Sequence, residues 1–281
     1  MDGKCGYKSF AAFCMDESRR MERHGDGYVE SNLGRFYETF LECARVLPPG
    51  AKTLSAGAGG AYVEKYLAHA CEAQVTVVDF PQAIEAHAED YRRYGFDTIG
   101  MDLAGQQRPE LDERFDAVLS FEVLEHLPVS PHEHIGFLSG LLGPGGCFLL
   151  STPNMAHLPN VLRLLRGRPL LPSAKLTFSP VVYENEYIHR REYVAAEIAE
   201  AMREAGLTQV KTAYLSGRRR GTLKGLIRRL YDLKPRWKKI LLLTGRKEPQ
   251  QVPGACPSFC VSKNGTVPFA DTTSGATADA A

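Results

Sequence analysis

A glycine-rich turn followed at a distance by a carboxylate is the feature of this sequence best suited to bind a ligand. The run 54–62 reads LSAGAGGAY and lies where a short apolar stretch gives way to a helical pattern. Glycines at such a turn allow positive φ and let a ligand approach bare backbone. Asp79 ends the next apolar stretch, where its carboxylate can accept both hydroxyls of a ribose. We therefore predict a site for an adenosine-containing ligand that includes Ala56, Gly57, Gly59 and Asp79.

The same kind of turn occurs in dinucleotide-binding enzymes, so the spacing of the glycines has to separate the two kinds of site. A dinucleotide fingerprint requires a glycine at position 62, where the helix packs closely against the strand. This chain has Tyr62 there. The turn therefore disfavours hydride transfer on a nicotinamide. A flexible turn followed by an ordinary acid, with no ligand at all, stays open as the plainer alternative.

Two histidines are candidates for proton transfer. His126 lies just past the apolar stretch 115–120, and histidine is the side chain best poised to remove a proton near neutral pH. Glu122 and Glu125 are close enough in sequence to orient its ring. His189 ends a run rich in polar and aromatic residues, which is typical of a lid over a substrate. We name His126, His189 and Glu122 as catalytic candidates, although capping or packing roles for the histidines remain open.

Strand and helix patterns alternate along the chain and must position these groups. An amphipathic helix is predicted over 33–47, where Pro48 and the residues after it end the pattern. Strands are predicted at 53–56, 74–78, 97–100, 115–120, 147–151, 210–215 and 240–245, with 259–262 competing for the last, and helices at 62–67, 81–94, 132–142, 194–205 and 223–231. This order predicts an α/β fold, a Rossmann-like doubly wound, mostly parallel seven-stranded sheet with an N-terminal helical cap.

We expect three parts in the chain. Residues 1–48 would form the helical cap, residues 49–264 the ligand-binding domain, and residues 265–281 a disordered tail, because that tail is mostly small and polar. A basic amphipathic insertion is predicted within the domain at 216–239.

These motifs together resemble the class I S-adenosylmethionine-dependent methyltransferases. The run of strand, acid and alternating glycines in that family aligns with Ser55, Gly57, Gly59 and Ala61. Ser55 replaces the acid, which normally makes a contact around the methionine amino group, and Ala61 replaces the third glycine. The segment 115–127 is the most specific match, and it resembles the ubiquinone-biosynthesis and related small-molecule methyltransferases.

The resemblance covers roughly residues 30 to 215 and implies S-adenosylmethionine as the cofactor. It implies that Asp79 clamps the ribose and that Phe80 lies against the adenine, whose edge meets Asp102 and Leu103. We also expect Arg35 to contact the carboxylate of the cofactor, and Phe121 to belong to the cofactor site. The implied acceptor is an oxygen or nitrogen of a small molecule, such as a quinone precursor, a sugar or an antibiotic-type metabolite.

Several classes of protein are disfavoured by composition. No apolar run approaches the roughly 18 residues that a membrane span needs, and the N-terminal residues lack a signal-peptide core, so we expect a cytoplasmic protein. The seven cysteines show no C-x-x-C spacing, and we expect neither a metal site nor disulfides. A homodimer is compatible with the sequence.

A basic segment leaves two other functions open. Residues 217–239 hold ten basic residues and one acid, and part of the segment is predicted to be helical. Such a surface is most often solvated, but it can bind anionic substrates, lipid headgroups or nucleic acid. A nucleic-acid methyltransferase is therefore an alternative, although residues 120–123 lack the Asn/Asp-Pro-Pro-aromatic run, and we expect no stable nucleic-acid complex. Ser55 and Ala61 support a third option, a non-catalytic partner protein with this fold.

Overall fold

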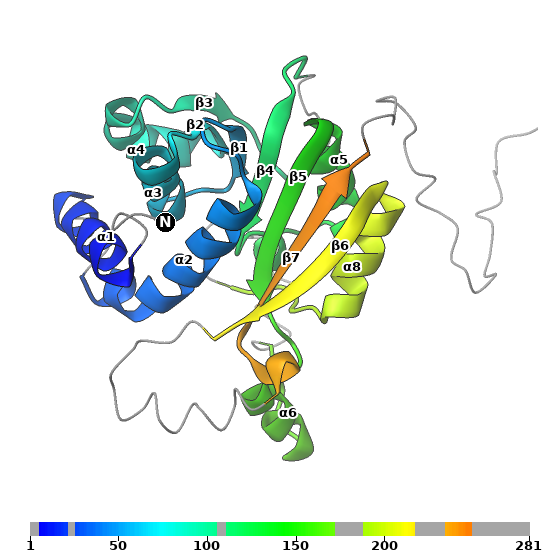
Figure 1. The fold of residues 1–281 in the computed structure, drawn as a ribbon. Coiled ribbons are helices and arrows are strands. Elements are labelled where there is room, and N and C mark those ends of the chain that lie inside the picture. The colour runs from blue at the N-terminus through cyan, green and yellow to red at the C-terminus, as the bar shows by residue number, and fades with distance from the viewer. Residues whose placement is uncertain (1–5, 22–25, 106–110, 172–187, 217–233, 249–281) are drawn as a thin grey trace, which may run out of the picture.

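The core of the molecule is a seven-stranded sheet with helices on both faces (Figure 1). The computed structural model of the chain describes residues 6–21, 26–105, 111–171, 188–216 and 234–248. The strand order is β3-β2-β1-β4-β5-β7-β6, and β7 alone runs antiparallel to its neighbours. The predicted α/β, Rossmann-like sheet is therefore confirmed.

The elements follow the predicted alternation closely. The strands are β1 (Lys52–Ala56), β2 (Gln74–Asp79), β3 (Asp97–Gly100), β4 (Phe115–Phe121), β5 (Leu142–Pro153), β6 (Leu207–Leu215) and β7 (Ile240–Lys247). The helices are α1 (Tyr7–Met21), α2 (Asp26–Val46), α3 (Tyr62–Cys71), α4 (Pro81–Arg93), α5 (Pro131–Gly140), α6 (Leu158–Leu165) and α8 (Ala195–Glu204), with short 3-10 turns η2 (Leu124–His126) and η3 (Pro235–Trp237). Among the described residues the last strand is β7, at the position predicted for 240–245. The competing segment 259–262, the helix 223–231 and the tail 265–281 lie outside the described residues.

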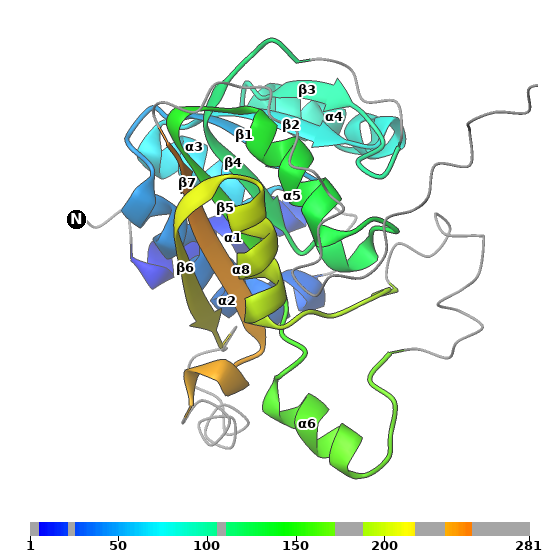
Figure 2. The same cartoon turned by 90° about the vertical axis from the view of Figure 1, so that its right-hand side faces the viewer.

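Two apolar cores lie on opposite faces of the sheet, because side chains along each strand alternate between the faces. Val118 and Leu150 face α5 and α8, whereas Leu119 and Leu149 face α1, α2 and α3. Figure 2 shows α6 set apart from the sheet, and none of its residues is buried. Among the described helices, none is both long and apolar enough to cross a bilayer.

The start of β5 differs from the prediction. We predicted a strand at 147–151, after the run Gly-Pro-Gly-Gly at 143–146, but β5 already begins at Leu142. The pairing with β4 shifts register between Phe115 and Ala117. A Cβ on Gly146 would lie 2.9 Å from the carbonyl oxygen of Gly143, so the absence of side chains lets this irregular stretch stay in the sheet.

The helices of the N-terminal segment are held by an aromatic cluster. The rings of Phe10 and Phe40 each pack edge-on against Tyr66 of α3, with centroids 4.8 Å apart. Phe36 of α2 stacks on Tyr62 at 5.4 Å. These contacts fix α2 beside the start of α3, at the end of β1.

The turn between β1 and α3 lies where the strand order reverses, because β1 is flanked by β2 on one side and β4 on the other. Ligands bind at such points, beyond the carboxyl ends of the strands. Gly57, Gly59 and Ala61 all have positive φ, at 70°, 50° and 50°. A Cβ on Gly57 would lie 2.6 Å from a methyl carbon of Val123, so only glycine fits there. Ala61 keeps the left-handed conformation even though it replaces the third glycine of the family pattern.

The conformation of Ala61 can be tested by substitution. A left-handed alanine costs about 1–2 kcal/mol, and a glycine there gains unfolded-state entropy of about 0.4–1 kcal/mol. We expect Ala61→Gly to change the free energy of unfolding by no more than about 1 kcal/mol. Ala61→Val should lower it by about 2 kcal/mol or more, because a β-branched side chain would be forced into the same buried position. Urea denaturation followed by circular dichroism measures both, and equal losses would contradict the assigned backbone.

Candidate functional site

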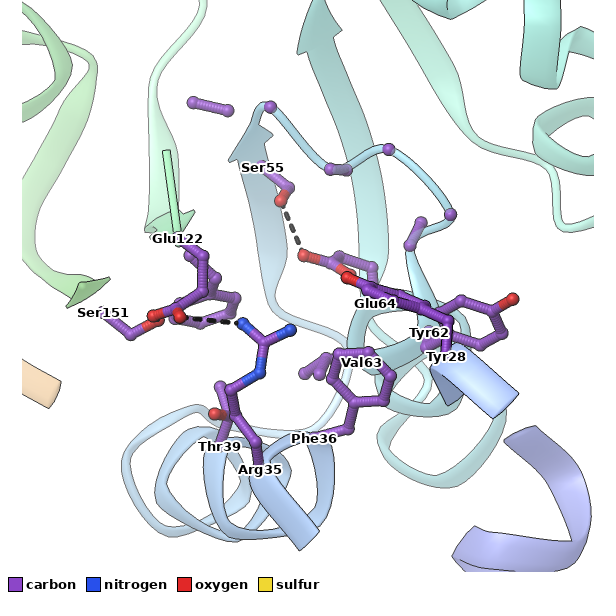
Figure 3. Close-up of a pocket in the computed structure, with 17 residues that line it drawn as sticks. Tyr28, Arg35, Phe36, Thr39, Ser55, Tyr62, Val63, Glu64, Glu122 and Ser151 are labelled. Carbon is purple, nitrogen blue, oxygen red and sulfur yellow. Dashed lines mark hydrogen bonds and ion pairs between the residues drawn. The ribbon is translucent and has the colours of Figure 1, made fainter. Parts of the chain in front are cut away.

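A cavity of about 210 Å³ lies at the carboxyl ends of β1 and β4, against α2 (Figure 3). Helix α2 contributes Tyr28, Arg35, Phe36 and Thr39; the β1–α3 connection contributes residues 55–64; and Phe121, Glu122 and Ser151 come from the ends of β4 and β5. Of the predicted site residues, the structure brings Arg35, Ala56, Gly57, Gly59, Phe121 and Glu122 together here. The sequence analysis missed Tyr28, Phe36, Thr39 and Ser151, although the first three share the helical spacing that places Arg35 on the same face of α2.

Arg35 and Glu122 form an ion pair across this cavity. Their side chains are 14% and 18% exposed, and Nη1 of Arg35 lies 3.0 Å from Oε2 of Glu122. Ser151 Oγ donates to the other carboxylate oxygen at 2.9 Å. The Nε of Arg35 is buried and has no hydrogen-bond partner among the described residues. Arg35 therefore retains a donor for an anionic group in the cavity.

Glu122 occupies a strained backbone position, with φ of 57°. Residues held in such conformations persist only where the surrounding structure fixes them, and they cluster at functional sites. We expected this carboxylate to orient His126. In the structure it pairs with Arg35 and accepts a hydrogen bond from Ser151, so that part of the expectation is corrected.

A second group of predicted residues continues along the same edge of the sheet. Asp79 ends β2, where its carboxylate accepts hydrogen bonds from the amides of Gly59 at 3.3 Å and Phe80 at 2.8 Å. Because Gly59 also lines the cavity, the carboxylate and the glycine turn meet as the sequence predicted. Asp102 follows β3 and caps the amide of Ala104 at 2.8 Å.

Leu103 is one of the most deeply buried of the predicted cofactor residues. Its side chain is 3% exposed and belongs to the apolar core on the α5 side of the sheet. The roles assigned to Leu103, Asp102 and Phe80 at the adenine stay predictions.

The two predicted histidines meet in space. The ring of His126 lies edge-on to the ring of His189, with centroids 5.0 Å apart. Nδ1 of His126 lies 3.2 Å from the carbonyl oxygen of Ile188. A carbonyl can only accept, so Nδ1 carries the proton and Nε2 keeps its lone pair. Burial lowers the pKa of His126, and the neighbouring His189 lowers it further, so its neutral form is favoured.

Glu125 is the acid that lies beside His126. Its carboxylate is 1% exposed; Oε2 accepts a hydrogen bond from Thr152 Oγ1 at 3.0 Å, and Oε1 lies 3.8 Å from Nε2 of His126. Burial raises the pKa of Glu125, and the negative charge of Glu122 raises it further. The carbonyl of Glu125 also accepts from the amide of Arg190 at 2.7 Å, which docks the His189 segment onto η2.

The side chains of Glu125, His126 and His189 together have the composition of a metal-binding group. Glu125, His126 and His189 each offer one ligand atom, and these atoms lie within 4.8 Å of one another. We expected no metal ligands from the cysteine and histidine spacing. Sequence spacing does not indicate this grouping, since His189 is far from the other two along the chain. The four described free cysteines, 14, 43, 71 and 147, are not part of it.

Comparisons with known proteins agree with this architecture. A family model described as a methyltransferase domain matches residues 26–212. The ubiquinone biosynthesis O-methyltransferase of Xanthomonas axonopodis pv. citri is 30% identical over 184 residues, covering 58% of this chain and 65% of that protein. The enzyme of the same name from Xanthomonas campestris pv. campestris is 36% identical over 121 residues, covering 40% of this chain and 46% of that protein. The chain thus spans about half to two thirds of the length of these curated relatives.

Solved structures share the fold at low identity. A Haloferax volcanii methyltransferase, solved in complex with the Trm112 methyltransferase activator, has a TM-score of 0.55 at 19% identity and covers 85% of this chain and 97% of its own. The magnesium protoporphyrin IX methyltransferase of Synechocystis, with bound S-adenosylhomocysteine, has a TM-score of 0.53 at 18% identity and covers 86% and 98%. Because the family model covers most of the sequence, this chain belongs to the class I S-adenosylmethionine-dependent methyltransferases.

Proposed function

We propose that this chain transfers a methyl group from S-adenosylmethionine to a hydroxyl oxygen of a small molecule of the quinone-precursor type. The observation that carries the proposal is the half-buried His126 at the carboxyl edge of the sheet. Its Nδ1 faces the carbonyl of Ile188, which leaves Nε2 free to accept a proton, and its lowered pKa favours the neutral form. The names of the curated relatives support oxygen as the acceptor atom and a quinone precursor as its class.

The residues of the cavity fit the cofactor. The amino-acid end of S-adenosylmethionine carries a carboxylate, which the buried, unpartnered Nε of Arg35 can bind. A Cβ placed on Gly59 would meet nothing within 4 Å, so the backbone beside Asp79 is open to a ribose. When bound, the cofactor supplies a methyl group made electrophilic by its sulfonium.

The protein's contribution is alignment and proton removal. Methyl transfer to oxygen is an in-line displacement, so holding the nucleophile close to the methyl group accounts for much of the rate enhancement. We assign the removal of the hydroxyl proton to Nε2 of His126, as the oxygen gains the methyl group. The imidazolium that forms would lie 3.8 Å from Glu125, and its positive charge would favour the ionised form of that carboxyl.

The alternative of a nucleic-acid methyltransferase rests on the basic segment 217–239. The structure describes only residues 234–239 of that segment, so it adds no support for this alternative.

The proposal is tested by binding and turnover. Isothermal titration calorimetry should detect binding of S-adenosylmethionine and S-adenosylhomocysteine. Labelled methyl groups should then appear on phenolic or catecholic hydroxyls in a panel that also contains amines, sugars and RNA. Absence of cofactor binding would favour the non-catalytic partner protein, and labelling of RNA alone would favour the nucleic-acid enzyme.

His126→Ala should lower kcat by roughly 10²–10⁴-fold, the usual contribution of a general base, with the dissociation constant of S-adenosylhomocysteine within about twofold of wild type. His132→Ala is the matched control, since His132 is a half-exposed histidine on α5 paired with Glu204. A rate near wild type for His126→Ala would exclude its role as the base.

The pH profile gives an independent test of His126. The neutral imidazole is the active form, so kcat/KM should fall as the pH drops through the lowered pKa of His126. His189 lowers that pKa, whereas Glu122 raises it and Glu125 lies 3.8 Å away. His189→Asn should therefore raise the pKa of His126 and move the acidic limb of the profile to higher pH. An unchanged or opposite shift would contradict the arrangement.

A further inference from the structure

A buried acid on α3 lines the cavity and has no role in the scheme above. Glu64 lies in the first turn of α3, and its side chain is 4% exposed. Ser55 Oγ, at the end of β1, donates to Oε1 of Glu64 at 2.7 Å (Figure 3). The two residues come from either side of the glycine turn, and both line the cavity.

The described cations around the cavity form ion pairs with acids other than Glu64. Arg35 is paired with Glu122. Lys65, the next residue along the chain, is fully buried and lies 3.5 Å from both Glu17 and Asp90. No described side chain forms an ion pair with Glu64. Burial raises the pKa of Glu64, although hydrogen bonds from Ser55 and the backbone and the charge of Lys65 oppose this shift.

A buried carboxylate without an ion-pair partner is unfavourable, and a ligand that brings a cation into contact with it relieves that cost. The same cavity holds a cationic side chain with an unused donor, the Nε of Arg35. Figure 3 shows Arg35 and Glu64 reaching into the cavity from different elements, α2 and α3. A buried acid without an ion-pair partner and a buried cation with an unused donor are together complementary to a zwitterion. The amino-acid end of a ligand is such a group, because it carries an ammonium and a carboxylate on the same carbon.

We infer that Glu64, oriented by Ser55, binds the α-ammonium group at the amino-acid end of the cofactor. This inference rests on the proposed binding of S-adenosylmethionine. It also accounts for the serine at position 55: the acid that is absent from the end of β1 is supplied nine residues later by α3. The carboxylate of Glu64 reaches the cavity from α3, and the hydroxyl of Ser55 at the end of β1 holds it by a hydrogen bond.

A purely structural role for Glu64 predicts a different outcome. Acids in the first turn stabilise a helix N-terminus, and the bond to Ser55 ties α3 to β1. If that were the whole role, Glu64→Gln would weaken all ligands of the cavity alike, or none of them. A role in binding the ammonium group weakens only ligands that possess one.

The test is a thermodynamic cycle that combines one substitution in the protein with one chemical change in the ligand. Calorimetry would measure wild type and Glu64→Gln with S-adenosylhomocysteine and with its deaminated analogue, in which hydrogen replaces the α-ammonium group. We expect Glu64→Gln to weaken S-adenosylhomocysteine about tenfold or more, as for a lost hydrogen bond to a charged group. The deaminated analogue and 5′-methylthioadenosine should change by less than about twofold, which also shows that the variant is folded.

A second variant moves the carboxylate from position 64 to position 55, the other partner of the Ser55–Glu64 hydrogen bond. The double variant Ser55→Asp, Glu64→Gln should recover much of the affinity for S-adenosylhomocysteine that Glu64→Gln loses. Equal weakening of both ligands, or no weakening at all, would overturn the role of Glu64. If wild type bound none of the three ligands, the proposed function would fail together with this inference; binding by wild type leaves the cycle to decide on Glu64 alone.

Discussion

The close approach of Gly57 to Val123 is the constraint on which the site depends. The backbone at the end of β1 lies so near the Val123 side chain, just past β4, that no side chain fits at position 57. This contact joins the glycine turn to the segment that carries Glu122 and His126. The two central parallel strands thereby hold the cavity and the proposed proton acceptor in one rigid frame, and α2, fixed by its aromatic contacts, forms the facing wall.

Much of the fold was predictable because its signals are local. The alternation of strand and helix patterns indicated all seven described strands, and Asp79 and the glycine turn followed from their positions at strand ends. The start of β5 was missed because four residues of Gly-Pro-Gly-Gly are normally a turn; only the register shift against β4 lets them remain paired. Helix α6 was not predicted. None of its residues is buried, so it does not contribute to the cores that the sequence pattern indicated.

The site was less predictable, since its decisive contacts join distant segments. The sequence placed both Glu122 and Glu125 near His126. Only the structure shows that Glu122, at a residue with positive φ, pairs with Arg35, whereas Glu125 lies beside the imidazole. The pairing of His126 with His189 depends on the docking of the Arg190 amide on η2. Ser55 was recognised as a departure from the family pattern, but its bond to Glu64 spans a turn whose geometry no spacing rule supplies.

The position of β7 has a consequence for how the chain is made. This strand, which is the last one along the described chain, inserts between β5 and β6. While the ribosome has not yet released residues 240–247, β6 cannot join the sheet and β5 presents an unpaired edge. Unpaired edges invite association with other chains. Nascent polypeptides that stall before this strand would therefore be prone to aggregation during biosynthesis, and completion of the sheet must await the synthesis of β7.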